Sequence, residues 1–159
     1  MDPSLLKYVV ATHGHIDHIG GLHYFQSLGA KVVCHELESG AVSEGRPERT
    51  AERYYRVSYQ PVSVDVTLSG EMQNLSVGDL TLHCPLTPGH TPGGIIPYLD
   101  IEGTRVLFGQ DIHGPFTRPG GRISVNGKIQ WRSSLICKPT SFVKGILAFT
   151  DRLPGCKTT

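Results

Sequence analysis

The sequence predicts an α/β fold, and two observations support that prediction. Short apolar runs rich in valine, isoleucine and tyrosine recur along the chain, and the first two, residues 5–11 and 30–34, are separated by a helix-like segment. The run at 5–11 leads directly into a loop crowded with histidines. Because open α/β folds place their functional sites where a strand ends before a helix, we expect a site in this loop.

The elements are expected in the following order. A strand at 5–11 precedes the histidine-rich loop, a helix covers 18–28 and ends at Gly29, and a second strand covers 30–34. Residues 51–59 begin as a helix and become irregular. We expect their tyrosines to pack on an amphipathic helix, and the alternative is that they wall a substrate cleft. Further strands are expected at 62–68, 80–84, 94–101 and 104–109, with a hairpin turn at 102–103.

The composition favours one cytoplasmic domain spanning 1–159. A chain of 159 residues with 38% hydrophobic content can form a single core, and a net charge of +1 gives no case for nucleic acid or an anionic membrane as a partner. No apolar run approaches the ~18 residues that span a bilayer. Residues 1–4 have neither the basic nor the apolar region of a signal peptide. The four cysteines include no C-x-x-C pair, so we expect no disulfide framework, with Cys34 and Cys84 as buried thiols.

The string Thr12–His18 contains three histidines and an aspartate. Burying several imidazoles and a carboxylate together is costly unless something charged pairs with them. Because side chains alternate along an extended strand end, His13 and His15 point to the same side and can bind one metal ion. Asp17 and His18 lie past the turn and can face a second ion. The loop therefore predicts a metal site whose donors suit zinc best, with iron or manganese as alternatives.

Two later residues are candidate ligands. His90 lies in a turn rich in proline and glycine, 87–94, where the backbone can approach a ligand closely. Asp111 follows the strand at 104–109, so that a carboxylate emerges from the end of an apolar element, and the alternative is an Asx turn. His113 is expected to line the cleft or to hydrogen-bond a ligand carboxylate. The histidines that we expect to be packed or on the surface are His23, His35 and His83.

These motifs resemble those of the metallo-β-lactamase-fold hydrolases. The string 12–18 resembles the signature of that superfamily, 87–94 resembles its second motif, and 107–111 resembles its third ligand strand. The resemblance extends from about Leu5 to about Trp131 and implies part of a four-layer αβ/βα sandwich. The ligands that it implies are His13, His15, His90 and a bridging Asp111 for the first metal ion, and Asp17, His18 and Asp111 for the second.

The resemblance implies a metal-dependent hydrolase that acts on a small-molecule substrate. A metal-bound hydroxide would attack an ester, thioester, lactone, amide or phosphodiester bond, and Asp17 would orient the hydroxide and take up a proton. The alternative is a non-catalytic metal-binding fragment that acts as an interaction or scaffold protein. An iron redox protein on the same fold is disfavoured, because such relatives usually carry a carboxylate where this chain has His15.

The chain also departs from the family pattern at both ends. The strand into His13 begins almost at Met1, so we expect the usual leading strands to be missing. The family's last ligand is a histidine, whereas residues 153–156 resemble the frame of that motif with Cys156 in its place. Thiolate can bind zinc, but a cysteine near a terminus is more often frayed. We therefore expect lower metal occupancy at the second position.

A homodimer or higher assembly is the expected compensation for missing strands. We expect Val9, Val32, Ile95 and Leu107 to share an apolar face that a second copy covers, because large apolar patches seldom survive on a soluble monomer. The competing expectation is a monomer whose segment 141–153 covers the same face.

Overall fold

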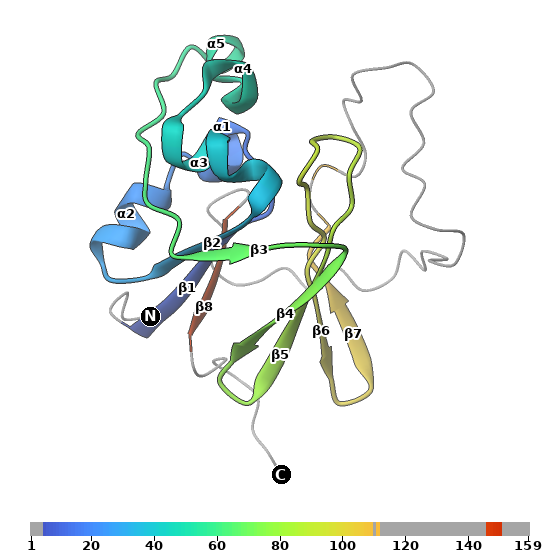
Figure 1. The fold of residues 1–159 in the computed structure, drawn as a ribbon. Helices are drawn as coiled ribbons and strands as arrows, with labels where there is room; N and C mark the ends of the chain where they lie inside the picture. Colours follow the sequence, from blue (N-terminus) through green and yellow to red (C-terminus); the bar gives the residue numbers. More distant parts are fainter. Residues whose placement is uncertain (1–4, 110, 112–145, 151–159) are drawn as a thin grey trace.

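The computed structural model describes residues 5–109, residue 111 and, as backbone, residues 146–150. These residues form two four-stranded sheets, in the orders β3-β2-β1-β8 and β4-β5-β6-β7 (Figure 1). The strands of the first sheet are β1 Leu6–Ala11, β2 Lys31–His35, β3 Val66–Leu68 and β8 Ile146–Thr150. The strands of the second sheet are β4 Met72–Val77, β5 Leu80–Pro85, β6 Tyr98–Ile101 and β7 Thr104–Leu107.

Short helices follow β1 and β2 and gather beside the first sheet (Figure 1). The helices α1 (Ile16–Ile19) and α2 (Leu22–Ser27) connect β1 to β2. The elements between β2 and β3 are the 3-10 turn η2 Glu36–Glu38, α3 Ser39–Glu44, α4 Pro47–Thr50 and α5 Glu52–Tyr55. The α/β class is therefore confirmed. None of the helices in the described part of the chain is long and apolar enough to cross a membrane.

The strand directions bring two loops to one edge of the first sheet. β1 is parallel to β2, with Val9 opposite Val32, and β2 is parallel to β3. Because parallel neighbours end at the same edge, the histidine-rich loop after β1 lies beside η2, which follows β2. Strand β8 runs antiparallel to β1 on its other side.

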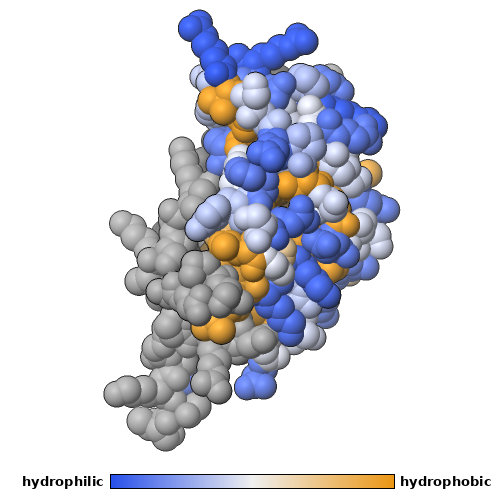
Figure 2. All heavy atoms as spheres, turned by 90° about the vertical axis from the view of Figure 1, so that its left-hand side faces the viewer, coloured by the Kyte–Doolittle hydropathy of each residue, from blue (hydrophilic) through white to orange (hydrophobic). Residues whose placement is uncertain are grey.

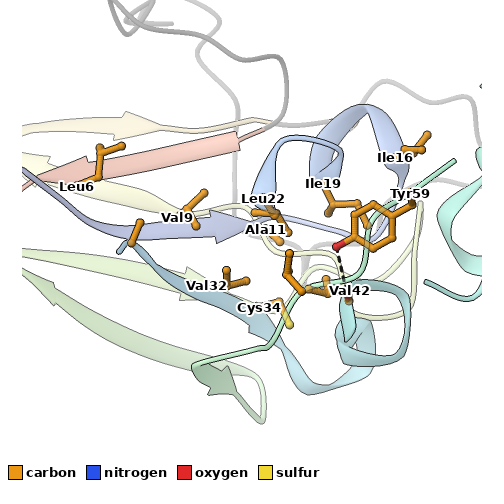
Figure 3. Close-up of a cluster of buried hydrophobic side chains, with 12 residues drawn as sticks. Leu6, Val9, Ala11, Ile16, Ile19, Leu22, Val32, Cys34, Val42 and Tyr59 are labelled. Carbon is orange, nitrogen blue, oxygen red and sulfur yellow. Dashed lines mark hydrogen bonds between the residues drawn. The ribbon is translucent and has the colours of Figure 1, made fainter. Parts of the chain in front are cut away.

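Alternate residues of β1 enter two different hydrophobic cores. Val9 packs with Val32 and Leu22 in the core between the first sheet and the helices, which Figure 3 shows. Val10 packs with Leu82 in the second core, between the two sheets. Successive side chains of a strand point to opposite faces. Both faces of β1 are therefore buried, which holds the loop that follows it on a rigid base.

The helix-side core is closed by Tyr59. Its hydroxyl donates a hydrogen bond to the backbone carbonyl of Val42 over 2.9 Å, drawn as a dashed line in Figure 3. The face of the molecule seen in Figure 2 is largely polar, with apolar side chains in small groups between polar ones. Such scattered apolar groups are normal on a folded surface.

Several predicted elements are confirmed, and others change in extent. The strands expected at 5–11, 30–34, 80–84 and 104–109 are present with small shifts at their ends. The helix expected at 18–28 is instead two helices, because the chain turns at Gly20 and Gly21. In the segments expected as strands at 62–68 and 94–101, only the last residues form strands, β3 (Val66–Leu68) and β6 (Tyr98–Ile101). Strand β4 was not predicted, because Leu75 and Val77 are its only buried residues and polar side chains alternate with them.

The expectation of one shared apolar face is wrong for the described residues. Val9 and Val32 lie in the helix-side core, whereas Ile95 lies in the core between the sheets, and Leu107 is half-buried. The described end of the chain, 146–150, pairs with the edge of β1 rather than covering a face. The particular surface that suggested a dimer is therefore not formed by these residues.

Candidate metal centre

The histidine-rich loop is built by the end of β1 and the start of α1. Thr12 and His13 are buried directly after the strand, and His15 has extended backbone angles, φ −73° and ψ 145°, at the N-cap of α1. Its carbonyl accepts hydrogen bonds from the backbone amides of His18 and Ile19 at 2.9 and 3.0 Å. This tight turn puts Asp17 and His18 in the first turn of α1, on the far side of the reversal from the two preceding histidines.

A second loop, between β5 and β6, brings His90 to the same place. The loop is closed at its base, where Thr87 donates to the Gly94 carbonyl through both its amide and its hydroxyl, at 2.7 and 3.1 Å. The Ile95 amide then donates to the carbonyl of Thr12 at 2.9 Å, which joins this loop to the one after β1. Asp111, beyond the end of β7, adds a carboxylate to the cluster.

Four side chains form the first ligand group: His13, His15, His90 and Asp111. Each offers one ligand atom, and these atoms lie within 4.8 Å of one another. The Nε2 atom of His90 is 2.9 Å from His15 Nδ1 and 3.4 Å from Asp111 Oδ2. The His90 ring stands at 84° to that of His13 and at 83° to that of His15. The candidate ligand atoms are therefore close enough to one another to bind a single ion.

The second ligand group consists of Asp17, His18 and Asp111. The Nε2 atom of His18 is 3.5 Å from Asp17 Oδ2 and 3.3 Å from Asp111 Oδ2. Asp111 belongs to both groups, so its carboxylate lies between them. All six residues that the sequence analysis named as ligands are thus brought together.

The hydrogen bonding of the cluster tests whether a metal ion fits. His13 Nε2, His18 Nε2 and Asp17 Oδ1 are buried, and within the described residues they have no hydrogen-bond partner. A buried polar atom left without a partner costs roughly 1–3 kcal/mol. Cations held by the two ligand groups would give His13 Nε2 and His18 Nε2 a partner and would place positive charge beside the Asp17 carboxylate. Imidazole with carboxylate is a donor set that zinc accepts. The residues present therefore fit a divalent metal ion.

The electrostatics of the cluster keep its histidines in the ligand form. Burial, together with the neighbouring imidazoles of His18, His15 and His90, lowers the pKa of His13 to about 2. Burial and then His90 also lower the pKa of His15. Both rings are therefore neutral near pH 7, and a neutral imidazole has the free lone pair that metal binding requires.

Tyr55 lies beside the candidate centre, although its sequence pattern favoured packing on a helix. Partial burial, together with the neighbouring carboxylate of Asp17, raises the pKa of Tyr55 to about 12. The packing interpretation is correct for Tyr59 but wrong for Tyr54 and Tyr55, which are 84% and 43% exposed. The short helix α5 presents them because left-handed backbone at Ala51, φ 56°, separates it from α4.

Glu38 is a second residue beside the cluster that the sequence analysis did not name. It is only 1% exposed. Its carboxylate accepts hydrogen bonds from the backbone amides of Gly14 and Gly93, at 3.0 and 2.6 Å. In sequence it is one of two glutamates in a short polar turn, so no local pattern marks it as buried.

The remaining histidines and cysteines behave as expected where they are described. His23 is exposed, and buried His35 bonds the Gly70 carbonyl at 3.1 Å. His83 stacks on Tyr98 with ring centroids 4.7 Å apart. Cys34 and Cys84 are free, buried thiols, and burial raises the pKa of each to about 12. Among the histidines and cysteines named earlier, His113 and Cys156 lie outside the described part of the chain.

Comparison with known proteins agrees with this geometry. The chain is 28% identical over 144 residues to the probable metallo-hydrolase YybB of Bacillus subtilis, covering 82% of this chain and 62% of that protein. It is 31% identical over 118 residues to the acyl-coenzyme A thioesterase MBLAC2 of Gallus gallus, covering 65% of this chain and 40% of that protein. The chain thus spans about half the length of these relatives.

A solved structure shares the fold. The crystal structure of BJP-1, a subclass B3 metallo-beta-lactamase of Bradyrhizobium japonicum, matches with a TM-score of 0.57 and 27% identity, over 66% of this chain and 40% of that one. The family model described as the metallo-beta-lactamase superfamily matches residues 2–123, which is most of the chain. With the ligand groups and the fold in agreement, the chain belongs to the metallo-beta-lactamase superfamily.

Proposed function

We propose that this chain is a zinc-dependent hydrolase of small-molecule substrates. The observation that supports the proposal most strongly is the position of Asp111, whose Oδ2 atom lies 3.4 Å from His90 and 3.3 Å from His18 and so belongs to both ligand groups. A carboxylate shared in this way suits two neighbouring metal ions. When bound, such ions supply Lewis acidity that acidifies water and stabilises negative charge on a substrate oxygen.

Asp17 is the residue that we assign to proton transfer. Its Oδ1 atom is buried and, within the described residues, has no hydrogen-bond partner, while Oδ2 is 3.5 Å from His18. Oδ1 can therefore accept a proton from water and return it to the leaving group. The Tyr55 hydroxyl lies near the same carboxylate and can donate a hydrogen bond to it.

The rim of the centre suits a substrate with an apolar acyl group. Leu37, Tyr54 and Tyr55 are 47%, 84% and 43% exposed. Tyr55 contacts Asp17, and its ring lies 5.2 Å from that of Tyr54. Leu37 packs closely against Gly93 of the His90 loop. Exposed apolar side chains beside polar reacting groups are typical of ligand sites. Because MBLAC2 is named as a thioesterase, we propose a thioester as the first substrate to test.

The test combines metal analysis with turnover of an acyl-coenzyme A thioester, an acyl-glutathione, a carboxylic ester and a phosphodiester. We expect zinc in the purified protein and hydrolysis of a thioester that His13→Ala abolishes. His23→Ala is the matched control, because His23 is exposed and lies outside the cluster. Stoichiometric zinc with no turnover of any substrate would instead favour the non-catalytic metal-binding alternative.

A further inference from the structure

The Glu38 carboxylate sits between the two loops that bear the histidines. Gly14 lies between His13 and His15, and its amide donates to Glu38 Oε2 at 3.0 Å. Gly93 lies three residues after His90, and its amide donates to Glu38 Oε1 at 2.6 Å. One side chain thus uses each of its oxygens on a different ligand loop, and these loops belong to different sheets.

The burial of Glu38 indicates a specific role. A carboxylate taken out of water is costly unless hydrogen bonds and charge replace its hydration. At 1% exposure, Glu38 has the two glycine amides and the guanidinium of Arg49, whose Nη2 is 3.8 Å from Oε1. Arg49 also donates to the Leu37 carbonyl, so that it holds the turn from which Glu38 projects.

The two glycines allow this close approach. A Cβ atom at Gly93 would lie 2.8 Å from Glu38 Cγ and 2.9 Å from Oε1, and one at Gly14 would lie 2.7 Å from Oε2. Contacts under 3.0 Å do not occur for real Cβ atoms without a shift of the neighbours. The backbone of both ligand loops therefore rests directly on the Glu38 side chain.

We propose that Glu38 is a positioning residue that holds the two ligand loops in register and thereby sets the affinity of the site for zinc. The proposal rests on the metal centre proposed above. The loops are also joined at their base, by the Ile95 amide and the Thr12 carbonyl, 2.9 Å apart. Loss of Glu38 therefore leaves the sheets connected but frees the loop tips that present His15 and His90.

A carboxylate is required because it only accepts hydrogen bonds and offers two oxygens. In Glu38→Gln one oxygen becomes an NH₂ group that faces a backbone N–H, so one loop loses its acceptor. In Glu38→Asp the charge remains, but the shorter side chain cannot reach both loops. Glu36→Gln is the matched control, since Glu36 is exposed in the same turn.

The first measurement is zinc affinity of the folded protein, by competition with a chromophoric chelator. We expect Glu38→Gln and Glu38→Asp to weaken binding by about 10- to 100-fold, the usual effect of removing a residue that supports metal ligands. Glu36→Gln should bind as the wild type does. A role in stability alone would lower the melting temperature of the metal-free protein and leave the affinity of folded molecules unchanged, and that result would overturn the proposal.

The second measurement is amide hydrogen exchange of Gly14 and Gly93 in the metal-free protein. We expect Glu38→Asp to accelerate exchange at both amides together, and unchanged exchange would overturn the proposal. If the wild type binds no zinc, the proposed function fails, and exchange still decides whether Glu38 holds the loops.

Gly93→Ala tests the same contact from the other side and serves if the Glu38 variants do not fold. The added methyl group must displace Glu38 and Leu37, so zinc affinity should fall. Gly40→Ala is its control, because a Cβ atom there meets only the flexible Arg46 side chain, at 3.2 Å. Zinc affinity equal to wild type in Gly93→Ala would count against the proposal.

Discussion

One carboxylate oxygen, Asp111 Oδ2, lies close to nitrogens of three histidines. The distances are 4.0 Å to His13 Nε2, 3.3 Å to His18 Nε2 and 3.4 Å to His90 Nε2. Two of these nitrogens, His13 Nε2 and His18 Nε2, are buried and lack hydrogen-bond partners among the described residues. The cluster is therefore organised around this side chain, and the proposed function depends on it more than on any one histidine.

Asp111→Asn should reduce the zinc content of the protein. The amide keeps an oxygen but loses the negative charge that would lie between two cations, and the second ligand group would keep only Asp17 and His18 as charged or imidazole donors. We expect the weaker ion to be lost first, as measured by elemental analysis after dialysis. Asp79→Asn is the control, because Asp79 is exposed in the turn between β4 and β5. Full zinc content in Asp111→Asn would contradict the shared role.

The stability of the metal-free protein should fall as the pH drops below about 6.5, the ordinary pKa of histidine. The folded-state pKa of His13 is lowered to about 2, so the folded protein leaves His13 neutral while the unfolded chain takes up a proton. Protonation of the unfolded chain favours unfolding, and His13 alone should remove about 1.4 kcal/mol between about pH 7.5 and about pH 5.5.

Urea denaturation with a chelator present measures this effect. His13→Asn should show a shallower dependence on pH than the wild type, because it removes one of the titrating groups. His23→Asn, at an exposed position, should keep the wild-type dependence. If the free energy of unfolding depended on pH equally in the wild type and in His13→Asn, the fold would not be holding His13 neutral.

At the scale of single elements, turns decide where strands and helices end. The hairpin between β6 and β7 uses Glu102 and Gly103, both with positive φ, 48° and 76°. Two successive left-handed residues match the twist of a tight hairpin, and this is why the turn predicted at 102–103 is confirmed. Strand β4 shows the opposite case, because its hydrophobic alternation is too sparse to be distinguished from a loop.

Gly103→Ala should destabilise the protein without changing the site. A Cβ atom at this position meets nothing within 4 Å, so the only cost is that of the left-handed backbone, roughly 1–2 kcal/mol. Chemical denaturation should detect this loss, and zinc content should stay at the wild-type level. Gly40→Ala, in helix α3, should be neutral or slightly stabilising, because alanine favours helices. If Gly103→Ala left the free energy of unfolding unchanged, that result would contradict the positive φ of Gly103.

At the scale of the whole molecule, the metal centre joins parts of the chain that are distant in sequence. Its candidate ligands come from the loop after β1, the loop between β5 and β6, and the residue beyond β7. These elements belong to two sheets that pack through a common core. The single domain, the cytoplasmic location and the homo-oligomer stay predictions, and light scattering would measure the last of them.

Removal of zinc should lower the melting temperature of the protein, because an ion bound by residues from both sheets binds the folded state alone. At free zinc about a thousand times its Kd, the expected stabilisation is about 4 kcal/mol. Thermal unfolding with zinc and with a chelator measures the difference, and His13→Ala should abolish it. If zinc did not change the melting temperature of the wild type, that result would contradict a metal site shared by the two sheets.

The sequence by itself determined the elements and residues whose signal is local. The string 12–18 predicts ligands because coordination chemistry restricts the donors to a few residue types, and the spacing along a strand end is short enough to predict orientation. His90 and Asp111 could be named for a related reason, since each follows a recognisable turn or strand. The structure then shows that the side chains of these residues lie close to those of the first loop.

Only the tertiary structure decided which residues surround that cluster. Glu38 receives its two hydrogen bonds from residues 24 and 55 positions away, and no local pattern separates it from exposed Glu36. Tyr55 likewise lies near Asp17, which is distant in sequence, although its sequence pattern favoured packing on a helix. Val9 and Ile95 enter different cores because the second sheet folds over one face of the first. Donor chemistry is a property of single residues, whereas burial and close approach depend on contacts between segments far apart in the chain.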